Sequence, residues 1–229
     1  APPDTSDAPA SVFDRRALAT DGLPAEAARR LKRILQEDQN ELLHRIRTHR
    51  GKGSLADNVP DPGEQLTRFN SSLQQVLSKA FAGGRQAAGA KGPGRPEGPL
   101  GSLIARQVVN PLRSEVGKIV GAGLDAGDTP SAIAERAGDV LRVWKGVRTE
   151  LLGEAMVYAA YHQGLLDAWG RNKKALKKWA LSVDEPHCPG GVCQKNADQG
   201  PLALKATFAS GHLAPPAHGG CTCALDKPE

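Results

Sequence analysis

Hydrophobic residues in the first three quarters of the chain recur at intervals of three and four, the spacing that places side chains on one face of an α-helix. The pattern covers residues 24–49, 61–82, 100–124, 130–144 and 147–170. It is clearest in the first two segments, whose apolar positions are Leu31, Ile34, Leu35, Leu42 and Ile46, and Leu66, Phe69, Leu73, Val76, Leu77 and Phe81. The sequence therefore predicts a mainly helical body.

Residues that favour helix ends stand at the borders of these segments. Pro24 and Pro62 suit a first helical turn, and Thr129 is a good N-cap. We expect Gly83-Gly84 to end the second helix, because glycine destabilises a helix interior. Pro111 should kink or split the third helix, since it lacks the N–H group that a helix interior needs.

From Leu176 onward the hydrophobic period changes from that of a helix to that of a strand. Trp179, Leu181 and Val183 alternate with Lys178, Ala180 and Ser182, which predicts one strand. A similar alternation over 202–208 predicts a second. The expected fold class is thus mainly α with a small C-terminal β-unit (α+β).

Composition divides the chain into four parts. Residues 1–22 begin with a stretch rich in Pro, Ala and Asp and are expected to form an extended tether. An N-terminal helical region covers 23–98, and its last part, 83–98, is rich in Gly and Pro and is expected to be a flexible, basic linker. The helical body then covers 99–174, and the β-unit covers 175–229.

The overall composition is that of an ordinary globular protein. The 229 residues are 39% hydrophobic and 24% charged, and only 4% are aromatic, so the core must consist largely of aliphatic side chains. No run of about eighteen apolar residues is present, and the N-terminal stretch lacks the basic start and apolar centre of a secretory signal. We therefore expect neither export nor a membrane partner.

The net charge of +5 is concentrated in two clusters. Eight basic residues stand against three acidic ones between Arg29 and Lys52, and five basic residues stand alone between Arg171 and Lys178. Such clusters attract polyanions, although a solvated helix face is the simpler interpretation of each. The candidate nucleic-acid-binding residues on the first helix are Arg29, Arg30, Arg33, Arg45 and Arg47.

All four cysteines lie in the last quarter of the chain, together with three of the six histidines. They form two groups about thirty residues apart, which is the usual pattern of a structural zinc site. The residues concerned are His187, Cys188 and Cys193 in the first group, and His212, His218, Cys221 and Cys223 in the second.

The spacing favours four protein ligands around one zinc ion. Cys188 and Cys193 are separated by Pro-Gly-Gly-Val, which can turn both sulfurs toward one point, whereas Cys221 and Cys223 can both bind only if the chain bends between them. His218 could replace one of the sulfurs. The candidate metal ligands are Cys188, Cys193, His218, Cys221 and Cys223, of which a closed tetrahedral site takes four. Disulfides, free thiols and a catalytic zinc ion are the alternatives.

Motifs for catalysis are absent from the sequence. It contains no Gly-x-Ser-x-Gly, no phosphate-binding glycine loop and no His-Glu-x-x-His. The adjacent His187 and Cys188 say nothing about the geometry of a catalytic pair. We expect His162 to be a packing residue and His212 to be structural. The chain is therefore expected not to be an enzyme, with no catalytic residue assigned.

An ordered series of motifs over about residues 127–225 resembles a known family. It consists of Arg148-Thr149-Glu150, Gly164, Lys178-Trp179, Asp184 and the terminal run from Pro215 to Cys223. Together these are similar to the phage Mu F-like family of minor head, or head-morphogenesis, proteins of tailed bacteriophages. The chain departs from the family pattern at Gly219, where Pro is usual, at Thr222, where Arg is usual, and in the wider spacing of its first two cysteines.

The resemblance implies a non-catalytic minor capsid protein that associates with the portal inside the head. Its expected partners are the portal, the major capsid or scaffolding protein, and packaged DNA through phosphate contacts. The expected location is the virion interior, after assembly in the bacterial host cytoplasm. Two alternatives remain: a zinc-stabilised protein that binds DNA without sequence preference, and a toxin-associated module with cysteine-based activity.

Overall fold

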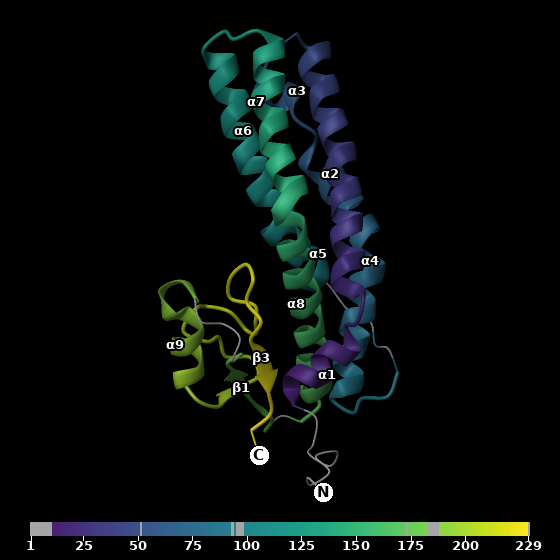
Figure 1. The fold of residues 1–229 in the computed structure, drawn as a ribbon, viewed down its shortest axis with the longest axis vertical. Coiled ribbons are helices and arrows are strands. Elements are labelled where there is room, and N and C mark those ends of the chain that lie inside the picture. The colour runs from purple at the N-terminus through teal and green to yellow at the C-terminus, as the bar shows by residue number, and fades with distance from the viewer. Residues whose placement is uncertain are drawn as a thin grey trace, which may run out of the picture. The chain divides into compact units, whose positions relative to one another are not determined.

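The computed structural model describes residues 11–50, 52–92, 94, 99–172, 174–182 and 188–228. It is mainly helical and has a small antiparallel sheet of three strands near the C-terminus (Figure 1). The expected fold class is therefore confirmed. Expectations that concern residues 1–10, Val183, Asp184 and His187 fall outside the described residues and stay predictions.

Two compact units make up the chain. The helical unit consists of Gly22–Ser78 and Pro96–Val157, and the sheet unit consists of Ala1–Asp21, Lys79–Arg95 and Tyr158–Glu229. Two long helices, α4 (Pro62–Ala87) and α8 (Thr149–Trp169), each contribute one part to either unit.

The helical unit is built on the apolar stripes that the sequence predicts. Its other elements are α2 (Leu23–Thr48), α3 (Leu55–Asn58), α5 (Pro99–Ile104), α6 (Asn110–Asp125), α7 (Pro130–Val143) and the π-helical turns η1 (Ala105–Val109) and η2 (Trp144–Arg148). Helix α7 packs between α2 and α6 (Figure 1). Aliphatic side chains from all three helices are fully buried there, among them Leu31, Leu35, Leu42, Leu112, Ile133 and Leu141.

A buried carboxylate joins α2 to α4 inside this unit. Asp38 accepts hydrogen bonds from Gln65 at 2.5 Å and from Arg68 at 3.0 Å. Arg113 of α6 extends the network by donating to Gln65 and to the Pro60 carbonyl, at 2.9 and 2.6 Å. Burial raises the pKa of Asp38, and these donors oppose the shift. The network fixes which side of α2 faces the neighbouring helices.

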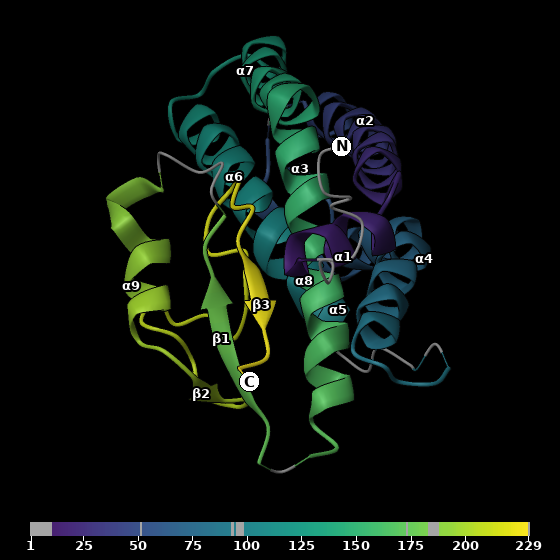
Figure 2. The same cartoon turned by 60° about the horizontal axis from the view of Figure 1, so that its bottom comes forward.

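The sheet unit surrounds a central strand. Its elements are α1 (Val12–Ala19), β1 (Leu176–Ala180), the 3-10 turn η3 (Pro189–Gly191), α9 (Val192–Asp198), β2 (Leu202–Ala203) and β3 (Ala224–Asp226). Figure 2 shows β1 between β2 and β3, and both pairings are antiparallel. Lys177 pairs with Leu202 and Trp179 with Leu225. Strand alternation turns Lys177 and Trp179 toward the same buried face.

The predicted strands are only partly correct. Strand β1 ends at Ala180, short of the predicted Leu181, and β2 has two residues in place of the predicted 202–208. Beyond Ala203 the chain turns, so that Phe208 reaches the core from a loop and not from a strand. The third strand, β3, was not predicted. Its three residues, which directly follow the last cysteine, are too few to show the alternation of apolar and polar residues that marks a strand.

Composition predicted an extended segment over residues 1–22, but residues 12–19 form helix α1. A capping box starts this helix, since Ser11 accepts from the Asp14 backbone N–H and Asp14 accepts from the Ser11 backbone N–H. Arg16 on this helix is buried. The helix is therefore anchored to the sheet unit by a side chain that usually faces water.

Two glycines allow α4 and α8 to cross in close contact within the sheet unit. A Cβ atom on Gly84 would overlap the Tyr161 carbonyl oxygen, and one on Gly164 would overlap the Phe81 carbonyl oxygen. The sequence predicts a helix end at Gly83-Gly84, but α4 continues through these two glycines to Ala87. The predicted split at Pro111 is observed: the stretch is divided into α5, η1 and α6, and Pro111 lies in the first turn of α6.

Candidate metal centre

The cysteines and His218 converge from three short segments of the sheet unit. Cys188 precedes η3, Cys193 lies in the first turn of α9, and Cys221 and Cys223 lie just before β3. The turn between the first two contains Gly190 and Gly191 at φ values of 66° and 64°, a region that residues with a side chain rarely adopt. The glycines thus bring both sulfurs to one side of the turn.

Their ligand atoms form two overlapping groups. Cys188, Cys193 and His218 make one, Cys193, Cys221 and Cys223 make the other, and within each group the atoms lie within 4.8 Å of one another. Cys193 belongs to both. The five residues predicted as candidate ligands are therefore gathered, although a tetrahedral ion would use four of them.

The distances fit the edges of a tetrahedral metal site. The sulfurs of Cys193 and Cys221 are 3.6 Å apart, and Cys193 Sγ is 3.4 Å from His218 Nε2. Zinc–sulfur bonds of about 2.3 Å and zinc–nitrogen bonds of about 2.0 Å at tetrahedral angles give edges of about 3.8 and 3.5 Å. All four cysteines are free thiols, since a disulfide requires sulfurs about 2.05 Å apart. The cluster can therefore hold a metal ion.

Backbone groups around the cluster are placed to support bound ligands. The Cys193 backbone N–H donates to the Cys188 sulfur at 3.1 Å, and such bonds stabilise a thiolate. His218 Nδ1 lies 2.9 Å from the Gly219 carbonyl oxygen. A proton on Nδ1 leaves Nε2 free to bind a metal, which is the arrangement that orients histidine ligands.

The three buried sulfurs differ in their affinity for protons. The neighbouring Cys221 thiol, followed by a hydrogen bond from the Ser182 backbone, lowers the pKa of Cys223 to about 6. Burial raises the pKa of Cys193, and the hydrogen bond with Cys223, together with burial, raises that of Cys221. One thiolate is thus available near neutral pH, and the others need a cation nearby to ionise.

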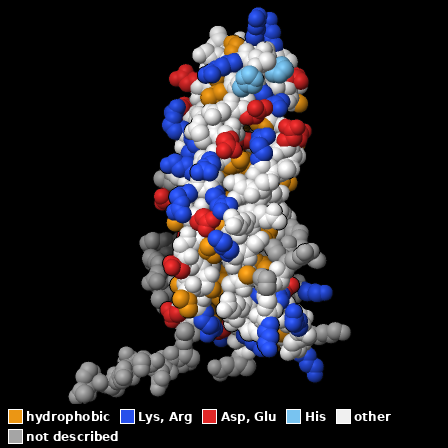
Figure 3. All heavy atoms as spheres, turned by 90° about the vertical axis from the view of Figure 1, so that its right-hand side faces the viewer, with side chains coloured by type: hydrophobic (Ala, Val, Ile, Leu, Met, Phe, Trp, Pro, Cys, Tyr) orange, Lys and Arg blue, Asp and Glu red, His pale blue; other side chains and the backbone are white. Residues whose placement is uncertain are grey.

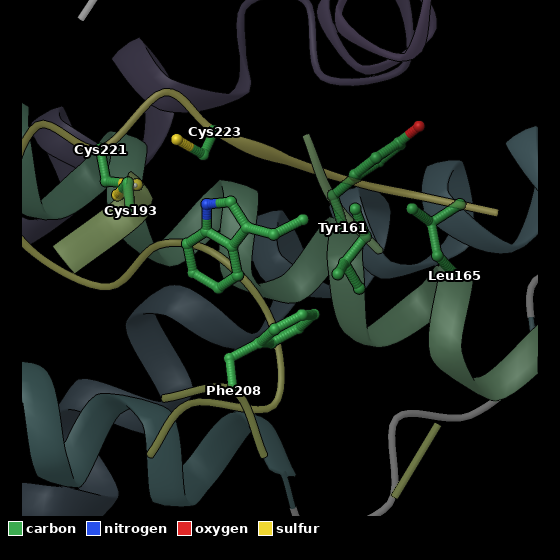
Figure 4. Close-up of a cluster of buried hydrophobic side chains, with 8 residues drawn as sticks. Tyr161, Leu165, Cys193, Phe208, Cys221 and Cys223 are labelled. Atoms are coloured by element: carbon green, nitrogen blue, oxygen red, sulfur yellow. Dashed lines mark hydrogen bonds between the residues drawn. The ribbon is translucent and has the colours of Figure 1, made fainter. Parts of the chain in front are cut away.

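An apolar shell encloses the sulfurs. Figure 4 shows Cys193 and Cys221 side by side, with Cys223 close to them and Phe208 on the opposite side of the cluster. Trp179 meets the Phe208 ring edge-on, at 5.0 Å between ring centroids. The exposed fractions of Cys193, Cys221 and Cys223 are only 1–2%. These three sulfurs are therefore shielded from solvent, whereas Cys188 and His218 are partly exposed.

Arg16 is a supporting residue that sequence reasoning missed. Its guanidinium donates to the carbonyl oxygens of Cys223 and Thr222, at 2.7 and 2.8 Å, and lies 3.9 Å from the centre of the Tyr158 ring. These contacts fix the backbone that carries the last two sulfurs. No sequence signal links an arginine near the N-terminus to this backbone, because the two are about two hundred residues apart.

The remaining residues of the region are structural. His212 is exposed, and its Nδ1 lies 3.0 Å from the hydroxyl of the nearby Ser210. Lys177, which the sequence places in a basic cluster, is fully buried and donates to the carbonyl oxygens of Leu204 and Leu213. Burial lowers the pKa of Lys177 to about 8. It ties the long loop after β2 to the central strand.

His162 is buried as expected, and its environment favours the neutral ring. Nδ1 lies 2.9 Å from the Pro215 carbonyl oxygen, and Nε2 has no partner among the described residues. Burial and the nearby Arg16 lower the pKa of His162 to about 3. An added proton would therefore be placed on a nitrogen that is shielded from solvent and has no acceptor among the described residues.

This makes the sheet unit sensitive to acid. Because the pKa of His162 is lower in the folded state than its usual value of about 6.5, the unfolded chain binds more protons as pH falls through that range. We expect a loss of about 2 kcal/mol in the free energy of unfolding between pH 7 and pH 5. Denaturant unfolding of the wild type and of His162→Gln, which keeps a side-chain donor, measures it. Parallel pH profiles for the two proteins would contradict this assignment, and acid release of metal would affect both equally.

The five predicted DNA-binding arginines of α2 differ in their exposure and in their partners. Arg30 donates to the Ser72 carbonyl and to Gln75 and pairs with Glu26, and Arg45 pairs with Glu41 at 2.6 Å. These two are engaged inside the helical unit. The exposed ones are Arg29, Arg33 and Arg47.

Comparisons with known proteins add no assignment. Protein-family models, curated proteins and solved structures were each compared with the chain, and none matches. Among the helices that the structure describes, none combines the length and the apolar character needed to cross a membrane.

Proposed function

We propose that the chain is a minor capsid protein of a tailed bacteriophage, which binds the portal inside the head and assists head assembly, or DNA packaging or ejection, without catalysis. The observation that carries this proposal is the ordered series of motifs from Arg148 to Cys223, which resembles the Mu F-like family. The portal protein is the expected main partner, and the major capsid or scaffolding protein is the expected second one.

The positions of the motif residues support a structural role. Arg148 pairs with Glu115 at 2.8 Å and lies 4.9 Å from the Trp144 ring. Gly164 permits the close helix crossing, and Trp179 is buried beside the cysteines. Each of these residues therefore maintains packing, which suits a protein that acts through its shape and surface.

Zinc is the ion that we propose for the cluster. Thiolates are soft ligands that favour zinc over magnesium or calcium, and imidazole is a common fourth ligand. Four protein ligands leave no coordination position for a substrate or a reactive water. The ion would consequently stabilise the fold of the sheet unit and take no part in a reaction.

The burial of three of the four sulfurs weighs against an activity based on Cys193, Cys221 or Cys223, whereas Cys188 is partly exposed. Reactive cysteines are partly exposed and have a lowered pKa, whereas Cys193 and Cys221 are buried and their pKa is raised. Cys223 has a lowered pKa, but its exposed fraction is 1%. Access for a substrate to any of the three is therefore poor.

Portal binding tests the proposed function directly. The chain is co-expressed with the portal protein of the same genome, and the complex is isolated by size-exclusion chromatography. We expect the two proteins to co-elute, and we expect purified particles to contain the chain in a small number of copies by quantitative mass spectrometry. Separate elution, together with absence from purified particles, would overturn the proposal.

A further inference from the structure

A basic hollow lies on the helical unit, outside the motif residues that carry the proposed function. It has a volume of about 570 Å³ and is lined by Arg29, Lys32, Arg33, Gln36, Glu37 and Lys145. Positions 29, 32, 33 and 36 share one face of α2, because they are separated by three, four and seven residues. Lys145 comes from η2. Two elements far apart in the sequence thus bring four cationic side chains together.

The cations on α2 are available to a ligand. Arg29, Lys32 and Arg33 are exposed, and none has an acidic partner among the residues that the structure describes. Among the described residues that line the hollow, Glu37 is the one that is acidic. Lys and Arg side chains gather midway along the face drawn in Figure 3. The hollow therefore carries an excess positive charge.

Lys145 is held in place beside these residues. Its ammonium donates to the side-chain oxygens of Gln36 and Gln39, both on α2, which positions it without neutralising its charge. Burial and the charges of Arg142 and Lys32 lower the pKa of Lys145. Partial removal of the ammonium from water is the main cause of this shift, and the two like charges add to it.

We propose that this basic hollow, consisting of Arg29, Lys32, Arg33 and Lys145, binds the phosphate backbone of duplex DNA without reading its sequence. Charge complementarity carries the choice of ligand, since a duplex presents a negative charge about every 1.7 Å along its axis. The α2 cations extend over about 6 Å of helix, which matches several successive charges. The hollow is shallow, and long flexible side chains line it, which suits a backbone more than an enclosed small anion. The inference uses none of the motif residues from Arg148 to Cys223, so it does not rest on the resemblance that carries the proposed function.

The salt dependence of binding tests the proposal. Fluorescence anisotropy of a labelled 30-base-pair duplex is measured with the full-length protein between about 50 and 200 mM KCl. Four phosphate contacts predict a slope of log K against log salt of about −3.6. The triple variant Lys32→Gln/Arg33→Gln/Lys145→Gln should reduce the slope to about −0.9 and weaken binding at the lowest salt by about tenfold or more.

Matched controls make the result specific to the hollow. The variant Lys118→Gln/Lys195→Gln/Lys205→Gln removes the same charge from three exposed positions elsewhere and should keep the wild-type slope. Arg29→Gln/Arg33→Gln changes exposed side chains only, so it reports on binding even if substitution of Lys145 disturbs packing. Equal slopes for the triple variant and its control would overturn the proposal. So would equal competition by inorganic phosphate at matched ionic strength, since that result would indicate a small-anion site.

Discussion

Cys193→Ser is expected to release the metal and to unfold the β-part of the sheet unit. Cys193 is the residue shared by both ligand groups, so its loss leaves neither complete. In small structural zinc sites the binding free energy, about 10–16 kcal/mol in peptides, is largely folding free energy. The three short strands could not compensate, because the longest has five residues.

Zinc content and thiol reactivity measure this effect. Wild-type protein in reducing buffer should contain about one zinc ion per chain, with its thiols protected until a chelator is added. The Cys193→Ser protein should contain almost none, and its remaining thiols should react at once. Wild-type protein without metal and with four reactive thiols would contradict the zinc site.

A set of single substitutions supplies the control. A tetrahedral ion takes four ligands and five candidates are present, so one of the variants Cys188→Ser, His218→Ala, Cys221→Ser or Cys223→Ser should retain zinc. That variant identifies the residue outside the coordination sphere. The same variant also shows that replacing a cysteine or histidine close to the ion does not by itself release the zinc.

Gly164→Ala is expected to destabilise the sheet unit by about 3 kcal/mol, the upper end of the usual cost of overpacking. The new methyl group would overlap the Phe81 carbonyl oxygen and lie 3.0 Å from the Arg85 backbone nitrogen. Both atoms belong to the α4 backbone, so no side-chain rotation can relieve the contact. The gain in helix propensity from glycine to alanine, about 1 kcal/mol, offsets only part of the cost.

Chemical denaturation of the full-length protein measures this cost, and another helical glycine provides the comparison. A Cβ on Gly121 of α6 would meet nothing within 4 Å, so Gly121→Ala should be neutral or should raise stability by about 1 kcal/mol. Gly84→Ala, on the other side of the crossing, should resemble Gly164→Ala. Unchanged stability in both crossing variants would mean that α4 and α8 do not approach as closely as described.

The long helices were predictable because each buries a wide apolar stripe. Leu31 to Ile46 of α2 and Phe69 to Phe81 of α4 are core residues in the positions that the period assigns to them. Helix α1 was not predictable, since eight residues carry too little periodicity and its buried residue is an arginine. The prediction at Gly84 was wrong for a related reason. The low helix propensity of glycine predicts a helix end there, whereas in the fold Gly84 lies within α4 and allows the close contact with α8.

The candidate metal ligands were the easiest part of the site to predict, because cysteine spacing is a local property of the sequence. The second layer was not accessible in this way. Arg16 supports Cys223 across about two hundred residues, and only the fold brings the two together. In the same way, sequence alone could not separate Arg30, which is paired within the helical unit, from Arg33, which is exposed.

Arg16 links helix α1 to the backbone of Thr222 and Cys223, so a metal ion bound by the cysteines would be thermodynamically coupled to the docking of this helix. An interaction that orders α1 against Tyr158 would raise the affinity of the cysteines for the ion, and by linkage the ion would favour the docked helix by the same factor. A partner that captures α1 would therefore weaken metal binding. In this way residues 12–19 would regulate the binding of an ion about two hundred residues further along the chain.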